Sequence, residues 1–201
     1  MKRLLSFFSY LLHPLFIPVF TVLFYFFCGG RYFQYQDMYV VFIQIIILTI
    51  LLPMAIYYFL MTFGKVTSIM LSDKAERRIP LAIYAVLLLV LIKKCITIGR
   101  FPELYFFFFA SLISTVIALI LVFMKRKASL HMIGIVSLTV FAIGISIHSQ
   151  VRMNEIIAFL VVCIGLVASS RLEMKAHTYT ELALGALTGL LPQLVLWYFW
   201  V

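Results

Sequence analysis

Long apolar runs alternate with short polar segments along this chain of 201 residues. A helix needs about 20 apolar residues to cross the hydrocarbon core of a bilayer. Seven runs approach this length, and they predict helices at about 10–28, 39–62, 80–98, 104–124, 131–148, 154–169 and 179–200. The sixth run is short, and the stretch 80–124 has only a brief polar break around Lys93, Lys94 and Arg100. The pattern therefore predicts six or seven spans.

The composition indicates that lipid surrounds most of the surface. Hydrophobic residues make up 65% of the chain and charged residues 11%, and the mean hydropathy is +1.16. Soluble domains are about half apolar and about a quarter charged. The apolar runs are continuous and lack a period of two, which favours helices over the strands of a membrane barrel. We expect an all-α, polytopic transmembrane helical bundle that forms one integral membrane domain over residues 1–201.

Three polar segments, 63–80, 125–132 and 169–181, follow the second, fourth and sixth predicted spans. Because successive spans alternate in direction, all three should emerge on the same face of the membrane. Five basic residues fall on the opposite face, and the remaining eleven of the 16 share the face of the polar segments. The positive-inside rule would place this face in the cytoplasm, but basic residues kept to bind a ligand do not report orientation. We interpret the net charge of +9 as positive loops and attraction to anionic head groups, not as binding of nucleic acid.

The third polar segment has the clearest chemical pattern. Thr178 and Glu181 have the spacing of a capping box that opens the last helix. His177 and Glu181 are four residues apart, so on a helix they share one face and the carboxylate can hold the imidazole in one tautomer. Arg171 ends the preceding helix and can fold back over the same place. The segment predicts an anion site that contains a nucleophile or base; the alternative is an ordinary basic loop at the membrane interface.

The other two polar segments add further cations and a second imidazole. In the second, Ser129 is a natural N-cap, His131 falls in the first helical turn, and Lys127 lies nearby. The alternative is a capped helix with an incidental histidine. The first segment supplies basic residues just before a first-turn proline, namely Lys74, Arg77 and Arg78 before Pro80. Its alternative is a basic cluster that binds lipid head groups.

Together the segments provide the parts that phosphoryl transfer needs: cations for the phosphate oxygens, a nucleophile and a proton donor. The stretch SSRLEMKAHTYTE resembles the third signature of the type-2 phosphatidic acid phosphatase (PAP2) superfamily, with Ser170, Arg171, His177 and Glu181 at the matching positions. The second signature, Pro-Ser-Gly-His, corresponds to ASLH at 128–131, and DKAERRIP matches the first without its proper spacing. The resemblance covers residues 63–190.

The resemblance implies a metal-independent lipid phosphatase, of the bacterial type, in the inner (cytoplasmic) membrane. It implies that His177 attacks phosphorus and forms a phosphohistidine, that Glu181 orients His177, and that His131 protonates the leaving oxygen. Basic side chains and one hydroxyl would hold the phosphate: Arg171, Lys74, Arg78, Arg77, Lys127 and Ser129. No cofactor or metal is implied, and the partners would be membrane lipids and a lipid phosphate substrate.

The departures from the family pattern leave other functions open. Leu130 replaces the glycine of the second signature, Glu181 replaces an aspartate, and the first signature is broken. A catalytically inactive protein that binds or transports phospholipid is the main alternative. A prenyltransferase would need paired aspartates for Mg²⁺, and Asp73 has no such partner in the sequence. His13 and His148 are interpreted as interfacial residues without a role.

Overall fold

The computed structural model describes residues 2–30, 32–64 and 75–201, and within these ranges it is helical and contains no β-strand. Lys74 and most of the first polar segment lie outside the described residues. The helices are α1 (Lys2–Leu11), α2 (Ile17–Cys28), α3 (Tyr35–Ile46), η1 (Ile47–Leu51), α4 (Leu52–Thr62), η2 (Ala75–Arg77), α5 (Arg78–Val90), η3 (Leu91–Cys95), α6 (Pro102–Phe123), α7 (Leu130–His148), α8 (Asn154–Glu173) and α9 (Tyr179–Trp197). The predicted all-α class is confirmed.

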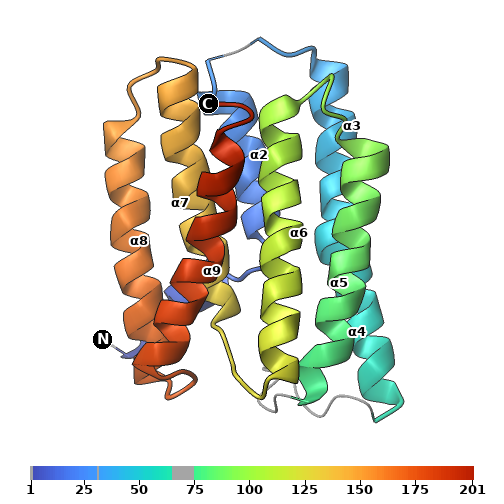
Figure 1. Ribbon diagram of the computed structural model, residues 1–201, viewed down its shortest axis with the longest axis vertical. Coiled ribbons are helices and arrows are strands. Elements are labelled where there is room, and N and C mark those ends of the chain that lie inside the picture. Colours follow the sequence, from blue (N-terminus) through green and yellow to red (C-terminus); the bar gives the residue numbers. More distant parts are fainter. Residues whose placement is uncertain (1, 31, 65–74) are drawn as a thin grey trace.

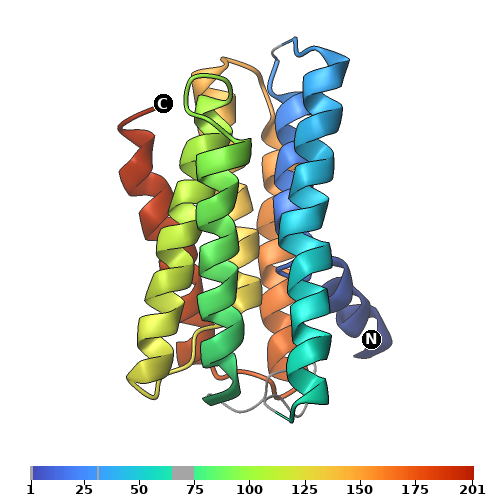
Figure 2. The ribbon, with the colours of Figure 1, turned by 90° about the vertical axis from the view of Figure 1, so that its right-hand side faces the viewer.

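The helices from α2 to α9 form one bundle in which successive long helices alternate in direction (Figures 1 and 2). The turns that precede α7 and α9 and the start of α5 gather at the lower end of Figure 1, together with α1. The C-terminus lies at the upper end. The described parts of the three polar segments therefore share one end of the bundle, as the alternation of the runs predicts.

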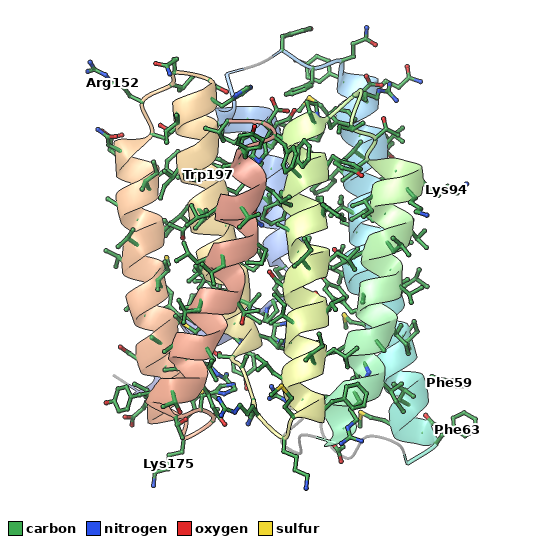
Figure 3. All side chains as sticks on the ribbon, in the orientation of Figure 1. Phe59, Phe63, Lys94, Arg152, Lys175 and Trp197 are labelled. Atoms are coloured by element: carbon green, nitrogen blue, oxygen red, sulfur yellow. The ribbon has the colours of Figure 1, made fainter. Side chains whose placement is uncertain are left out.

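Five helices in the described ranges are long and apolar enough to cross a membrane. They are Tyr35–Thr62, Pro102–Phe123, Leu130–His148, Asn154–Glu173 and Tyr179–Trp197. Large apolar side chains project outward around the bundle (Figure 3), and Phe27, Val162 and Val195 are each more than half exposed. Such a broad apolar surface is compatible with an integral membrane protein.

Prolines account for the irregular backbone of the first two predicted spans. The first predicted span, 10–28, is shorter in the structure: a separate helix, α1, ends at Leu11, and α2 begins at Ile17. Pro14 and Pro18 favour this break and new helix start, and Pro18 lies in the first turn of α2. The second run stays continuous but contains the π-helical turn η1 just before Pro53. Proline has no N–H for the regular helical ladder, and a π turn is one way for a helix to adjust to it.

Small residues bring α9 against α7 and so fix the lower end of both helices. A Cβ atom added at Gly185 would lie 2.6 Å from the carbonyl oxygen of Ser129, and one at Gly189 would lie 2.5 Å from that of Ile133. Only glycine permits this approach of the two backbones. Farther along α9, Pro192 cannot donate to the Thr188 carbonyl, which instead accepts from the Ser114 hydroxyl at 2.8 Å.

Candidate functional site

The third polar segment begins where α8 ends in a Schellman motif. The Ala176 N–H donates to the Arg171 carbonyl at 3.0 Å and the Lys175 N–H donates to the Leu172 carbonyl at 2.9 Å. Lys175 has the left-handed conformation that this motif requires (φ 51°). This turn reverses the direction of the chain between α8 and α9. Arg171 lies just before it, in the last turn of α8.

A capping box then opens α9, as the sequence predicts. The Glu181 N–H donates to Thr178 Oγ1 at 3.4 Å, and the Thr178 N–H donates to Glu181 Oε2 at 3.3 Å. The same carboxylate oxygen lies 2.9 Å from Nδ1 of His177. Glu181 therefore both caps the helix and fixes the orientation of the imidazole, with Nδ1 as the protonated nitrogen.

His177 is held as a neutral base with one nitrogen available. It is 8% exposed, and among the described residues its Nε2 has no hydrogen-bond partner. Burial lowers the pKa of His177 to about 4; the hydrogen bond to Glu181 opposes this shift, and the nearby cations Lys127 and Arg77 add to it. At neutral pH the unprotonated Nε2 can act as a nucleophile.

The second polar segment is joined to the third by hydrogen bonds. α6 ends in a Schellman motif like that of α8, with Lys125 in the left-handed conformation (φ 59°). After this turn, Lys127 Nζ donates to the Ala176 carbonyl at 3.1 Å, and the Ser129 N–H donates to the Glu181 carbonyl at 3.1 Å. Two segments remote in the sequence therefore form one unit.

Ser129 occupies the N-cap position of α7, but its hydroxyl makes no capping hydrogen bond. Its Oγ is fully buried and has no hydrogen-bond partner among the described residues. A buried hydroxyl without a partner costs free energy, but Ser129 does not line the cavity described below.

His131 lies in the first turn of α7 and faces α1. Its Nε2 lies 3.1 Å from the carbonyl oxygen of Ser9, which requires the proton on Nε2 because a carbonyl can only accept. The His13 ring packs edge-on against the His131 ring, with centroids 5.2 Å apart. Burial, and next the cation Arg171, lower the pKa of His13, so these two adjacent imidazoles avoid a pair of like charges.

Arg171 is a buried cation without an acidic partner among the described residues. It is 6% exposed, and its Nη1 donates to the Ser9 hydroxyl at 2.8 Å. Its Nε is buried without a hydrogen-bond partner, and no carboxylate in the described part of the chain forms an ion pair with it. A buried charge normally has a counter-ion, so this guanidinium indicates a site for an anion.

Arg77, from the first polar segment, lies near the groups of the other two polar segments. It is 6% exposed, and its Nη1 reaches the Ala128 carbonyl at 3.5 Å. Burial lowers the pKa of Arg77, Glu181 raises it, and Arg171 lowers it; a guanidinium stays charged at neutral pH in any case. Arg77 therefore lies near both Glu181 and Arg171.

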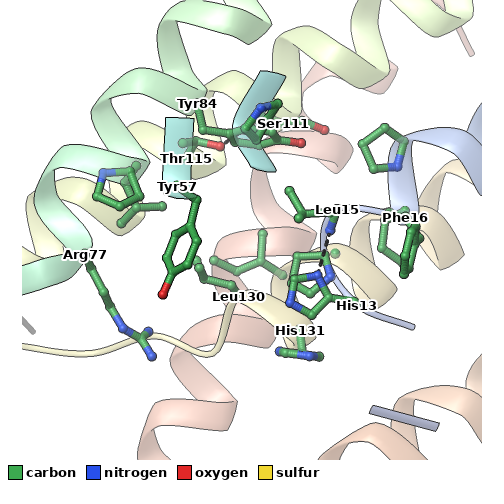
Figure 4. Close-up of a pocket in the computed structure, with 18 of the residues that line it drawn as sticks. His13, Leu15, Phe16, Tyr57, Arg77, Tyr84, Ser111, Thr115, Leu130 and His131 are labelled. Carbon is green, nitrogen blue, oxygen red and sulfur yellow. Dashed lines mark hydrogen bonds between the residues drawn. The ribbon is translucent and has the colours of Figure 1, made fainter. Parts of the chain in front are cut away.

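One cavity of about 540 Å³ connects these groups. His131, His177, Arg77 and Arg171 all line it, so the two predicted imidazoles open into the same space. Tyr57 of α4 also lines the cavity, and its buried hydroxyl has no hydrogen-bond partner among the described residues. Figure 4 shows Tyr57 between Arg77 and the pair His13–His131, with the hydroxyl pointing toward the polar end of the cavity.

Other predicted residues lie beside the cavity or away from it. Ser129, Lys127 and Glu181 do not line it but support the residues that do. Arg78 is exposed, and its guanidinium carbon lies 5.0 Å from the centre of the Phe123 ring. Lys74 lies outside the described residues.

His148, to which the sequence assigns no role, lies at the far end of α7. Its Nε2 is 3.4 Å from Oε1 of Glu103, a buried residue in the first turn of α6. This pair therefore belongs to the opposite end of the bundle from the cavity.

Three residues of the site are missed by the sequence analysis, namely Ser9, His13 and Tyr57. They are distant from the polar segments in the chain and reach the cavity only because α1, the α1–α2 turn and α4 pack around its lower end. A helical serine and two aromatic rings in apolar runs carry no pattern of their own. His13 before Pro14 is the one available signal, since an X-Pro pair marks a turn.

No protein-family model, characterised protein or solved structure matches this chain. The resemblance to the PAP2 superfamily thus depends on the three sequence motifs. Among the described residues, no group of three His, Cys, Asp or Glu side chains could hold a metal ion. The polar end of the cavity consists of cations, imidazoles and hydroxyls, which suit an oxyanion such as phosphate.

Proposed function

We propose that this protein is an integral membrane lipid phosphatase that works through a phosphohistidine intermediate. The observation that carries the proposal is the shared cavity: His131 and His177 line it together with Arg77 and Arg171. His177 has its Nδ1 on Glu181 and its Nε2 without a partner among the described residues. A nucleophile held by an orienting carboxylate beside buried cations is the arrangement that phosphoryl transfer requires.

In the first step, Nε2 of His177 attacks phosphorus and forms a P–N bond. The bond from phosphorus to the lipid oxygen breaks, its electron pair stays on that oxygen, and His131 supplies the proton that makes it an alcohol. The negative phosphate beside His131 favours the protonated imidazole, which then has an N–H for the leaving oxygen. Arg171 and Arg77 neutralise the equatorial oxygens.

In the second step, water attacks the phosphohistidine. His131, now neutral, accepts the proton of this water as it attacks phosphorus, the P–N bond breaks, and its electron pair returns to His177. Inorganic phosphate leaves, and both histidines regain their starting states. Glu181 keeps the His177 proton on Nδ1 throughout, so Nε2 is the reacting nitrogen in both steps.

The substrate in this proposal has its phosphate at the membrane interface and its tail among apolar helices. Phosphatidate, phosphatidylglycerophosphate, a polyprenyl phosphate or pyrophosphate, and a phosphorylated glycolipid all fit this description. α2 and the helix from α5 through η3 would complete seven spans beside the five long helices, in the inner membrane of a bacterium. The end of the bundle with α1 and the polar segments would be the interfacial end.

Phosphate release by the purified protein tests the proposal. Protein in detergent micelles should release inorganic phosphate from phosphatidate, and His177→Ala should abolish the release. Thr180→Ala is the control, because Thr180 is exposed one turn from the site. Radiolabelled substrate should leave an acid-labile label on the wild type and none on His177→Ala. Equal phosphate release by wild type and His177→Ala contradicts the proposal.

A protein that binds a lipid phosphate without cleaving it is the second candidate. The contact that favours it is the hydrogen bond from His131 Nε2 to the Ser9 carbonyl, which occupies the proton needed by the leaving oxygen. In that case His177→Ala should leave the affinity for radiolabelled phosphatidate nearly unchanged, whereas Arg171→Ala should weaken it by at least about tenfold, since a buried ionic contact is lost. Measurable turnover by the wild type excludes this candidate.

A further inference from the structure

The cavity extends far beyond the polar residues at its lower end. Residues of α5 line the cavity as far along the helix as Leu88. Leu88 is ten residues, or about 15 Å, beyond Arg78 at the start of α5. On α6 it reaches Phe107 and Phe108, which are both fully buried in the middle of the bundle. A phosphate fills only the polar end, so the remaining chamber must serve another part of a ligand.

The wall of this chamber presents almost no hydrogen-bonding capacity. Away from the polar end, three of the hydroxyls that line it donate to helix carbonyls: Ser111 to Phe107 at 2.9 Å, Thr115 to Ser111 at 2.8 Å and Ser137 to Gly189 at 3.1 Å. Tyr84 of α5 also lines this wall, beside Ser111 and Thr115 (Figure 4), and its phenol ring presents a mainly apolar surface. Apolar side chains provide the rest of the surface between them. A mainly apolar wall whose serine and threonine hydroxyls already donate to carbonyls favours a hydrocarbon over a sugar or a peptide.

The chamber also has an exposed rim where it meets the outer surface of the bundle. Phe16 from the α1–α2 turn and Met54 and Tyr58 from α4 line the cavity and are between 39% and 54% exposed. Met54 and Tyr58 belong to the apolar helix α4, whereas the Phe16 ring packs edge-on against His13 with centroids 6.3 Å apart. An opening there allows an alkyl chain to pass sideways from lipid into the chamber.

We propose that the chamber binds the single hydrocarbon chain of a lipid phosphate whose head lies against Arg171 and Arg77. The inference deepens the proposed function, on which it rests, by naming a single-chain alkyl or isoprenyl phosphate as the preferred substrate. A volume of about 540 Å³ lies within the usual range for a site that encloses one small ligand. In this proposal one chain occupies the chamber, and the second acyl chain of a two-chain lipid stays outside the rim.

Filling the chamber tests the inference. Ser111→Phe adds a ring to the wall, and the lost hydrogen bond is one within its own helix. It should lower kcat/KM for hexadecyl phosphate by at least about tenfold, because several methylene groups lose their burial, and leave kcat/KM for butyl phosphate unchanged. Val116→Phe is the matched control, since it adds the same ring to the same helix at a residue that is 40% exposed and does not line the cavity.

Two further measurements keep the test decisive. Ser137→Leu, on the facing helix α7, should repeat the effect of Ser111→Phe, and size-exclusion elution and thermal midpoints identify any variant that does not fold. Wild-type protein should also prefer hexadecyl phosphate to dipalmitoyl phosphatidate. If both wall variants affect hexadecyl and butyl phosphate equally, or neither, the inference is overturned while the phosphatase proposal stands.

Failure of the phosphatase proposal gives a different result. Wild-type protein would then release phosphate from none of these compounds. Retention of radiolabelled hexadecyl phosphate by the same variants would then test, without turnover, whether the chamber binds the chain. Loss of retention in Ser111→Phe and Ser137→Leu but not in Val116→Phe supports the inference, and equal retention by all three variants overturns it.

Discussion

Arg171 Nη1 donates to the hydroxyl of Ser9 at 2.8 Å, which ties the last turn of α8 to α1. The backbone carbonyl of the same serine accepts from His131 at 3.1 Å. One residue of a short N-terminal helix thus contacts both a predicted phosphate-binding cation and the predicted proton donor. The lower wall of the cavity is complete only with α1 in place.

Removing the Ser9 hydroxyl should weaken substrate binding. In Ser9→Ala, Arg171 loses a hydrogen bond of a charged donor, which contributes about 1.5–3 kcal/mol. If Ser9 positions the guanidinium, KM for a lipid phosphate should rise by about tenfold while kcat changes little. The control is Ser149→Ala at the opposite end of α7. An unchanged or lower KM would show that the hydroxyl does not help Arg171 to bind phosphate.

Adjacent arginines offer a matched comparison. Arg77 lines the cavity, whereas Arg78 is exposed against Phe123. Arg77→Ala should therefore raise KM by at least about tenfold, because a buried cation leaves the phosphate site, and Arg78→Ala should change KM less than about twofold. Steady-state phosphate release measures both. A larger effect of Arg78→Ala would mean that the phosphate lies outside the cavity.

Glu181→Gln should separate the two tasks of this side chain. The amide oxygen can still cap the Thr178 N–H, but it no longer supplies a charge to hold the His177 tautomer. We expect kcat to fall by about 10²–10⁴ with a small change in KM. Thr178→Ala is the control: it removes the cap hydroxyl, costs about 1 kcal/mol of stability and should leave kcat largely intact. Similar kcat values for Glu181→Gln and wild type would remove Glu181 from the mechanism.

The local features of the site follow directly from sequence patterns. The capping box of Thr178 and Glu181, the His177–Glu181 pair four residues apart and the place of Arg171 in the last helical turn all depend on contacts within a few residues. The capping box has a fixed spacing at a helix start. His177 lies before the N-cap and outside α9, so it reaches Glu181 through this turn and not by helical periodicity. The shared end of the polar segments also follows, because it needs only the number and order of the spans.

Long-range contacts could not be obtained in this way. The buried position of the Tyr57 hydroxyl and the hydrogen bond from Arg171 to Ser9 depend on which helices are neighbours and on how each helix is rotated about its axis. The sequence also does not separate Arg77 from Arg78, since a rotation of about 100° per residue decides which one faces inward. The sequence predicts Ser129 as the N-cap of α7, and Ser129 occupies that position, but its hydroxyl makes no capping hydrogen bond.

Close packing of α7 on α9 should be required to hold His131 near His177. Gly189→Ala places a methyl 2.5 Å from the Ile133 carbonyl, so the helices must separate, at a cost of about 1–3 kcal/mol. Gly165→Ala is the matched control, because a Cβ on this residue of α8 has no atom within 4 Å and alanine is the better helix former. Thermal midpoints should fall for Gly189→Ala and hold or rise for Gly165→Ala. Equal midpoints would contradict the close approach.

Acidic pH should destabilise the fold before it removes the nucleophile. Burial lowers the pKa of His177 to about 4 from the ordinary 6.5. Between these values the unfolded chain binds a proton that the folded protein does not, so the free energy of unfolding decreases as pH falls from 6.5 to about 4 and is level above 6.5. The same shift keeps Nε2 unprotonated, so the acid limb of kcat/KM should lie near pH 4. Thermal midpoints across this range should decline less steeply in His177→Ala. An acid limb near 6.5 would mean that a different, normally titrating group limits the reaction, and that His177 is not the nucleophile held neutral by its burial.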